Sequence, residues 1–454
     1  MHAKIAAASV LCALAVSAHI ATPAVADVQS ASAPTPQVTL SLHDAVQLAL
    51  SNNLTYQSAV ADERAAEAQI VQARSAFQPK VSAGYSYFHT QNEGAFVFPA
   101  PSPSGPPKLQ RVVVSAKDLN NVNATLQYAL YTGGAAEAAI GQAAANLAAT
   151  QSQLAGLRAT VIADTTRSYF ALIEAQQSAH VADQAASVAA QNLKTASELF
   201  KAGTAAKVDV LRSDVTLADA QVNAIKAHNN ASLANARLAN DLNINLGAII
   251  TPSESLQSQA PAFTLDSLLD SARARPELAA ANDAVIIADH AVRGARAAYL
   301  PSVDLQVQEA SSKPNFVNVP QPQLSETLAV TWQLFSGGLT RGKVLQALAQ
   351  VDKAKINLKA INNSVDLEVR EAYFNYTAAQ AQVGAALEAT ESSGESLRVN
   401  QIRYRSGVGT SLELSDALLS NTQAQNQYIS ALADLRVSLV AVQRAAGLLP
   451  PTGI

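Results

Sequence analysis

Four segments of the chain alternate between apolar and polar residues with a period of two, which is the pattern of β-strands. In the clearest, 121–131, Val122 and Leu126 point to one side and Asn123 and Gln127 to the other. We predict strands over about 80–90, 121–131, 302–308 and 324–335. Strands of ~9–11 residues with one apolar face suit a membrane barrel. A half-buried sheet of a soluble domain would alternate in the same way.

Long helices are predicted between these strands. The chain has no proline from Lys108 to Thr251 or from Gln323 to Leu449, and proline is the residue that breaks helix interiors. Both windows are rich in Ala, Gln and Leu, which favour helix. A single helix over 134–201 would be roughly 100 Å long at ~1.5 Å per residue.

The chain is also a tandem repeat. The sequence Leu-Tyr-Thr-Gly-Gly at 130–134 returns as Leu-Phe-Ser-Gly-Gly at 334–338, an offset of 204 residues. The same offset relates Lys201-Ala-Gly203 to Arg405-Ser-Gly407. Such a register predicts two structural repeats. We assign 27–247 to the first repeat, 248–264 to a connector, 265–449 to the second repeat and 450–454 to a short tail.

Each repeat is predicted to contain a helical hairpin. Gly203 and Gly407 follow helical segments that end in basic residues, as helix-ending glycines do. Thr410 and Glu413 then have the spacing of a capping box that starts a new helix. The returning helices carry apolar residues at 3.5-residue spacing, which predicts coiled-coil packing. The tips therefore lie near 203 and 407.

The first 26 residues read as a secretory signal peptide. A basic Lys4 precedes an apolar stretch, and Ala24-Val25-Ala26 offers a cleavage site. A membrane anchor is the alternative. The sole cysteine, Cys12, lies inside this segment, so we expect no disulfide, thiol catalyst or cysteine metal site in the mature chain.

Charge and histidine placement argue against several function classes. The chain has 31 basic and 35 acidic residues, so it lacks the excess of basic residues that is typical of nucleic-acid-binding proteins. The histidines beyond the signal are scattered without metal-ligand spacing, and no glycine loop follows a strand to hold phosphate. We therefore expect no enzyme activity, no metal and no cofactor.

Four strands cannot close a barrel in lipid, because an open edge leaves backbone groups unpaired. Three protomers would supply twelve strands, continued by a tunnel of twelve helices; two protomers would also close. We predict the homotrimer. Polar, proline-rich loops at 91–120 and about 309–323 would lie outside the cell. The aromatic residues expected at the membrane interface are Tyr85, Tyr87, Tyr128 and Trp332.

These features together resemble the outer-membrane efflux protein family, the TolC-like channels. The resemblance rests on the tandem halves, the two Leu-aromatic-x-Gly-Gly junctions, the Pro79 and Pro301 helix-to-strand junctions, and the two tip motifs. It implies a mainly α fold with a β-barrel part, in the outer membrane of a Gram-negative bacterium and extending into the periplasm.

The resemblance also implies a function. Such a trimer is the exit duct of a tripartite efflux or type I secretion system, passing small molecules or proteins outward. Its partners would be outer-membrane lipid, a periplasmic adaptor (membrane fusion) protein at Gly203 and Gly407, and an inner-membrane pump of RND, ABC or MFS type. A barrel-anchored coiled-coil structural or adhesive envelope protein is the alternative, and it would not conduct ions.

Site residues follow from the resemblance as well. Glu413 and Asp416 occupy the positions of the family's acidic pore gate, and three copies would form two carboxylate rings. A capping role for Glu413 and a surface role for Asp416 are the simpler alternatives. Tyr404 and Asp209 match a latch that holds the closed tip, but Gly409 stands where the family has an arginine.

Overall fold

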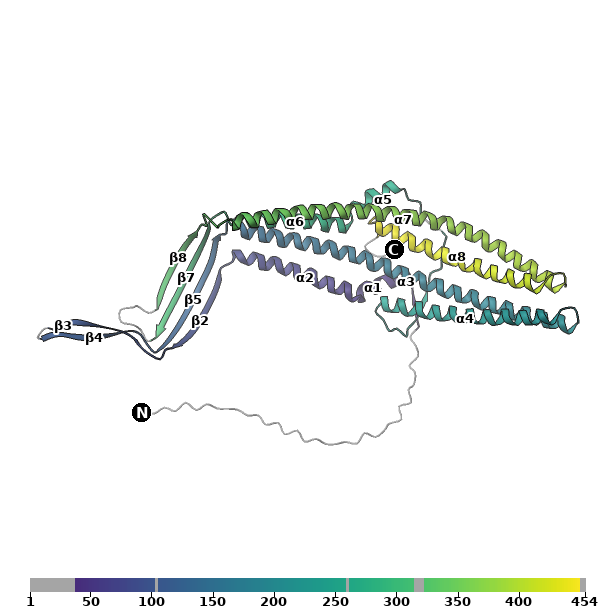
Figure 1. Cartoon of the computed structure of the whole chain (residues 1–454), viewed down its shortest axis with the longest axis horizontal. Helices are drawn as coiled ribbons and strands as arrows, with labels where there is room; N and C mark the ends of the chain where they lie inside the picture. The colour runs from purple at the N-terminus through teal and green to yellow at the C-terminus, as the bar shows by residue number, and fades with distance from the viewer. Residues whose placement is uncertain (1–36, 103–104, 259–260, 314–321, 450–454) are drawn as a thin grey trace, which may run out of the picture.

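The computed structural model describes residues 37–102, 105–258, 261–313 and 322–449, so the predicted signal peptide and C-terminal tail lie outside the described residues. The molecule is long and narrow, with a sheet at one end and paired helix tips at the other (Figure 1). The strands are β1 Gln37–Leu40, β2 Lys80–His89, β3 Gly94–Ser102, β4 Gly105–Ser115, β5 Asp118–Tyr131, β6 Ile249–Pro252, β7 Ser302–Lys313 and β8 Gln323–Thr331. The helices are α1 Leu42–Asn52, α2 Leu54–Arg74, α3 Ala135–Lys201, α4 Lys207–Asp241, α5 Leu265–Ala272, α6 Pro276–Ala297, α7 Leu339–Arg405 and α8 Ser411–Ala445, with a 3-10 turn at Ser75–Phe77.

The main sheet is antiparallel, with the strand order β2-β5-β7-β8. The β5–β7 ladder joins the two repeats, and Thr125 lies opposite both Ser82 and Gln308. Pairing residues share a face, so one face carries mainly Ser, Thr, Asn and Gln, and the other mainly Val, Leu and Tyr. Within the described chain, β2 and β8 each have one edge without a partner strand.

Four details of the sheet region differ from the sequence prediction, one being that β5 begins at Asp118 rather than at 121. Residues 94–115, expected as part of a loop, form the β3–β4 ribbon, in which the prolines are tolerated because both strands have a free edge. Strand β7 extends to Lys313 rather than ending at 308. Strand β8 ends at Thr331 rather than 335, because Thr331 pairs with Ser302, the first residue of β7, and no ladder partner follows.

The four main helices keep the register of the repeat. Helices α3 and α7 have 67 residues each, and α4 and α8 have 35 each. The boundaries of α3 and α4 have their counterparts in α7 and α8, 204 residues later. The long helices begin after Gly134 and Gly338, whose φ values of 91° and 89° suit glycine rather than residues with a Cβ. The two repeats are therefore built on one plan.

Helix α3 lies between α4 and α8, and α7 packs on the other side of α8. Helix α6 fills the groove between α3 and α7, whereas its counterpart α2 packs against α3 but has no comparable second neighbour. Large apolar residues of α4, among them Val215 and Ile225, remain exposed in the single chain. Helices α2 and α4 thus each have a side that no other helix of the described chain covers, just as β2 and β8 each have a free edge.

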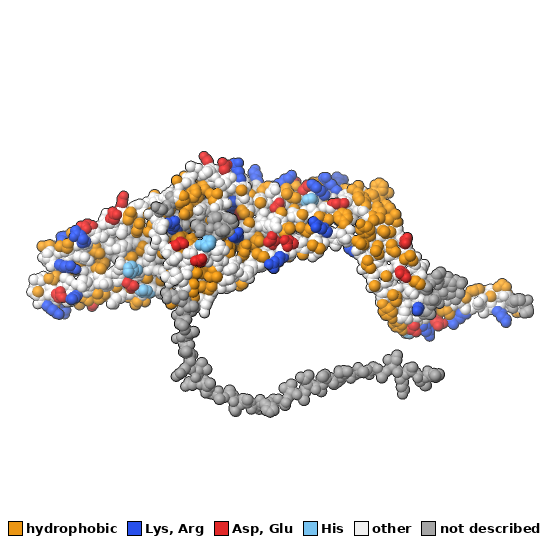
Figure 2. Space-filling view, turned by 180° about the vertical axis from the view of Figure 1, so that it is seen from behind, with side chains coloured by type: hydrophobic (Ala, Val, Ile, Leu, Met, Phe, Trp, Pro, Cys, Tyr) orange, Lys and Arg blue, Asp and Glu red, His pale blue; other side chains and the backbone are white. Residues whose placement is uncertain are grey.

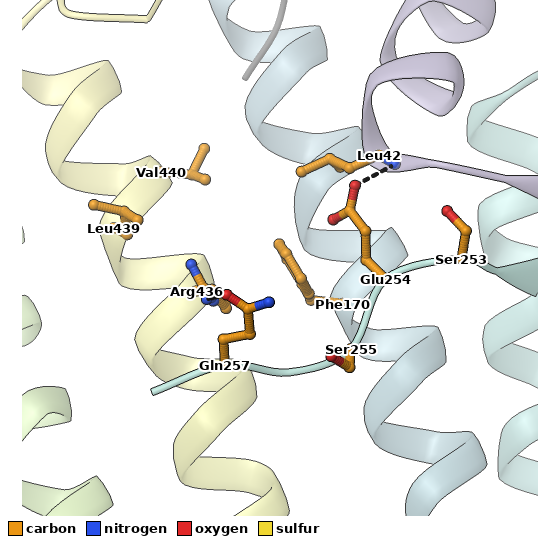
Figure 3. A pocket seen from close by; sticks show the side chains of 9 residues that line it. All are labelled: Leu42, Phe170, Ser253, Glu254, Ser255, Gln257, Arg436, Leu439 and Val440. Carbon is orange, nitrogen blue, oxygen red and sulfur yellow. Dashed lines mark hydrogen bonds between the residues drawn. The ribbon is translucent and has the colours of Figure 1, made fainter. Parts of the chain in front are cut away.

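The middle of the molecule holds the connector between the repeats. Strand β6, in this connector, pairs in parallel with β1, which lies at the start of the first repeat. Next to it is a hollow of 440 Å³ between α3, α8 and the connector (Figure 3). Glu254 lines this hollow, points toward the start of α1 and accepts a hydrogen bond from the Leu42 amide at 3.1 Å. The connector thereby caps the start of α1.

A buried arginine fixes the second repeat. Arg275, only 3% exposed, precedes α6 and bonds Glu277, Glu368 of α7 and the carbonyl oxygen of Ala445 in α8. Burial opposes its charge, but the hydrogen bonds that it donates to the two glutamates outweigh that effect and raise the pKa of Arg275. One side chain therefore ties three helices together.

No helix among residues 37–102, 105–258, 261–313 and 322–449 is both long and apolar enough to cross a membrane.

Candidate functional site

The two hairpin tips have the same backbone geometry. Gly203 and Gly407 adopt φ values of 75° and 78°, which is the left-handed region that glycine enters without strain. The Thr204 amide bonds the Leu199 carbonyl and the Val408 amide bonds the Arg403 carbonyl, both at 3.0 Å. These bonds close the helix ends. Exposed apolar side chains surround both turns: Phe200, Val208, Ile402, Val408 and Leu412.

A polar cluster joins the two tips of the same chain. Asp209 of α4 accepts a hydrogen bond from the Ser411 hydroxyl of α8 at 2.6 Å, and Arg212 donates to that hydroxyl at 3.2 Å. One turn further, the hydroxyls of Thr216 and Ser415 lie 3.3 Å apart. We call Asp209, Arg212 and Ser411 the tip clasp. It links helices that otherwise touch little along their length.

Tyr404 does not form the expected latch bond in this structure. Its side chain is 5% exposed, and its hydroxyl has no hydrogen-bond partner within the described chain. Burial raises the pKa of Tyr404, and the nearby charge of Asp209 adds to the effect. Asp209 instead bonds Ser411 and the Ala206 amide. Within the single chain Asp209 is therefore engaged by the tip clasp, and the latch pairing of Tyr404 stays a prediction.

Gly409 lies close against the end of α7. A Cβ at this position would stand 3.0 Å from the Tyr404 amide nitrogen and 3.1 Å from the Arg403 carbonyl carbon. An arginine here would require the turn to shift. The departure from the family pattern is thus part of how this tip folds.

Glu413 is engaged as a helix cap. Its carboxylate accepts from the Thr410 amide at 3.0 Å, and the Thr410 hydroxyl accepts from the Glu413 amide at 3.2 Å. The bond from the Thr410 amide, with the charge of Arg403, lowers the pKa of Glu413. The cap stabilises the start of α8, as the sequence spacing predicted.

Asp416 has different surroundings. It lines a 780 Å³ groove between α3, α4 and α8, on the side of the tip clasp facing away from the turns. The charged residues of this groove are all acidic: Glu174, Asp219 and Asp416. Most of the remaining lining is Asn, Gln, Ser, Thr and Ala. The groove therefore presents negative potential to anything that moves along it.

The four candidate interface aromatics fall at two levels of the sheet. Tyr85 and Tyr87 lie near the end away from the helices and donate to Asn120 and Asp118. Tyr128 and Trp332 lie toward the helical end, where the Trp332 indole donates to the Tyr299 carbonyl at 3.1 Å. The role of these four residues at the membrane interface stays a prediction. The sequence did not point to Arg212 and Ser411, because their contact belongs to no local motif.

Comparison with known proteins agrees with this architecture. Residues 45–243 and 268–448 match the family described as "Outer membrane efflux protein". Protein CyaE of Bordetella pertussis is 27% identical over 335 residues, covering 72% of this chain and 71% of that protein. Outer membrane efflux protein BepC of Brucella suis is 23% identical, covering 89% and 85%.

Solved structures show the same fold. The outer-membrane channel OprN superposes with a TM-score of 0.75 at 21% identity, covering 89% of both chains. The Campylobacter jejuni CmeC outer membrane channel gives 0.76 at 19%, covering 90% of this chain and 87% of that one. The family match spans both repeats. The chain therefore belongs to the outer membrane efflux protein family: it is an outer-membrane exit duct with a TolC-like fold that extends into the periplasm.

Proposed function

We propose that three copies assemble into one duct, which docks a periplasmic adaptor coupled to an inner-membrane pump of RND, ABC or MFS type. The observation that carries the proposal is the pair of open edges on β2 and β8. Each unpaired backbone group would cost several kcal/mol in lipid, and pairing β2 of one protomer with β8 of the next removes that cost. Three chains of four strands give a barrel of ordinary size.

The helical part supports the same assembly. Within one protomer α6 packs against both α3 and α7, whereas α2 lacks the second neighbour. Placing α2 against the neighbouring protomer's α7 would repeat the internal arrangement around the ring. The exposed apolar residues of α4 would be covered at the same time.

Gating is proposed to take place at the tips. The tip clasp holds the two hairpins of a protomer together, and Asp416 supplies the acidic ring that favours cations. Glu413 contributes through its cap and Tyr404 through packing. The exposed apolar residues around Gly203 and Gly407 offer the adaptor a surface that it can bury.

The test is conductance of the purified protein in planar bilayers, together with its mobility on gels with and without heating. We expect a heat-sensitive, SDS-resistant trimer that conducts with cation preference, and a weaker preference in Asp416→Ala. A non-conducting trimer would favour a structural envelope protein. A monomer that stays soluble with or without detergent would contradict the proposed duct. Loss of export in a deletion strain would then identify the substrates.

A further inference from the structure

Four basic residues form a band where the helices meet the main sheet. Arg74 ends α2, Arg296 lies in the last turn of α6, and Arg341 and Lys343 lie near the start of α7. We call these four the basic collar. All four side chains are exposed, and in the part of the chain that the structure describes none makes an ion pair or side-chain hydrogen bond.

The collar occurs in both repeats. Arg74 precedes Pro79 by five residues, and Arg296 precedes Pro301 by five residues. Each arginine therefore stands at the same distance from the strand that follows it. In the trimer proposed above, six such arginines would encircle the duct at one level.

The first turn of α7 carries the opposite charge from the first turn of α3. The positive end of the helix dipole favours acidic residues in the first turn and disfavours basic ones. At the first turn of α3 this residue is Glu137, whereas its counterpart 204 residues later is Arg341, with Lys343 two residues on. The two exposed cations add their charge to the positive end of α7, which makes this level of the molecule favourable for an anion.

The collar borders an exposed apolar belt. Trp332, Leu334 and Phe335 precede α7, and Tyr299 and Leu300 precede β7; all five are exposed. Figure 2 shows Lys and Arg side chains on the helical part beside the hydrophobic surface of the sheet. Aromatic residues followed by cations mark the boundary between hydrocarbon and headgroups.

A hollow of 370 Å³ lies at the same level, between the start of α3 and the end of α6. Arg293, Arg296 and His290 line it together with Glu137. Arg293 is paired with Asp289 at 2.9 Å, but the buried Nδ1 of His290 has no partner among the described residues. The buried Nδ1 of His290 lies against Gly141 of α3, so among the described residues Arg296 is the free donor of this hollow, which has room for a phosphate group.

We propose that the basic collar binds the phosphate headgroups of anionic phospholipids in the periplasmic leaflet, and so fixes the depth at which the duct sits. The orientation in this proposal rests on the proposed function. The collar supplies charge, the apolar belt holds the acyl region, and the hollow accepts a phosphate. Each cation held near an anionic surface strengthens its attraction about fivefold.

The test uses Trp332, the only tryptophan of the chain, in full-length trimers reconstituted into vesicles. Brominated phosphatidylglycerol or brominated phosphatidylcholine is mixed into unlabelled lipid, and quenching of Trp332 fluorescence is compared. Wild type is expected to be quenched severalfold more by the anionic lipid, with the excess lost in high salt. Replacing the four collar residues by Gln should reduce that excess to the level of the neutral lipid.

A matched control removes the same charge at the far end of the molecule: Lys194, Lys201, Lys207 and Lys226 to Gln. It should leave the lipid preference unchanged. Arg74→Gln and Arg296→Gln, made singly, give smaller losses if the fourfold variant fails to insert. Equal quenching by both lipids in wild type, or an undiminished preference in all collar variants, overturns the proposal. Conductance of the same wild-type sample tests the duct separately.

Discussion

The tip clasp predicts that Ser411→Ala opens the duct. The Ser411 side chain is 2% exposed and donates to the carboxylate of Asp209 at 2.6 Å while accepting from Arg212 at 3.2 Å. Hydrogen bonds to charged groups contribute about 1.5–3 kcal/mol. Because Asp209 is partly exposed, we take the lower end, about 1.5 kcal/mol or roughly tenfold per protomer. If three protomers open together, the open-to-closed ratio should rise by about a thousandfold.

Single-channel recording in planar bilayers measures this ratio directly, as the fraction of time spent at high conductance. Ser406→Ala is the matched control, because the Ser406 hydroxyl bonds only the carbonyl oxygens of Ile402 and Arg403 in its own helix. It should leave the open fraction unchanged. Equal opening by both variants, or no opening by Ser411→Ala, would refute the clasp as the closing device.

Three further predictions concern single side chains. Tyr404→Phe removes a buried hydroxyl that has no partner among the described residues. We expect the closed state to be kept, and the unfolding free energy to be unchanged or higher by up to about 1 kcal/mol. A higher open fraction in planar bilayers would instead support a latch role for this hydroxyl. Arg275→Met removes the ion-pair partner of Glu277 and leaves Glu368 with only the 3.8 Å pair to Arg444. It should lower the unfolding free energy by about 2–3 kcal/mol, measured by denaturant melting in detergent. The pKa of Glu413 is lowered in the folded chain, so the cap contributes its full stability above the ordinary glutamate pKa and loses it as pH falls through the lowered value. Hydrogen exchange at the second tip should therefore rise in acid. Glu413→Gln should abolish that pH dependence.

Much of the fold was predictable because long elements leave strong local signals. The long segments without proline predicted α3 and α7, and Gly203 and Gly407 predicted the positions of the two tips. The β3–β4 ribbon was missed because Pro99, Pro106 and Pro107 read as loop, although a two-stranded ribbon leaves room for them. Strands β1 and β6 have four residues each and lie far apart in sequence, so no local periodicity marks their pairing.

The candidate site was predicted less completely for a related reason. Glu413 carries a local motif, and its capping bonds are present. Arg212 and Ser411 carry none, and they meet only because the two hairpins fold side by side. The burial of Tyr404 without a partner likewise depends on packing between helices rather than on spacing. Motif matching names positions in a tip, whereas the contacts among them are set by the tertiary fold.

The equal lengths of α3 and α7, and of α4 and α8, restrict how a duct of this kind can change its reach. One residue inserted into a single helix would turn everything beyond it by ~100° and lift one tip by ~1.5 Å. Only a whole heptad added to all four helices preserves both the facing sides and the level of the tips. The span of such a duct therefore grows in steps of roughly 10 Å, and envelopes of different thickness call for discrete variants rather than graded ones.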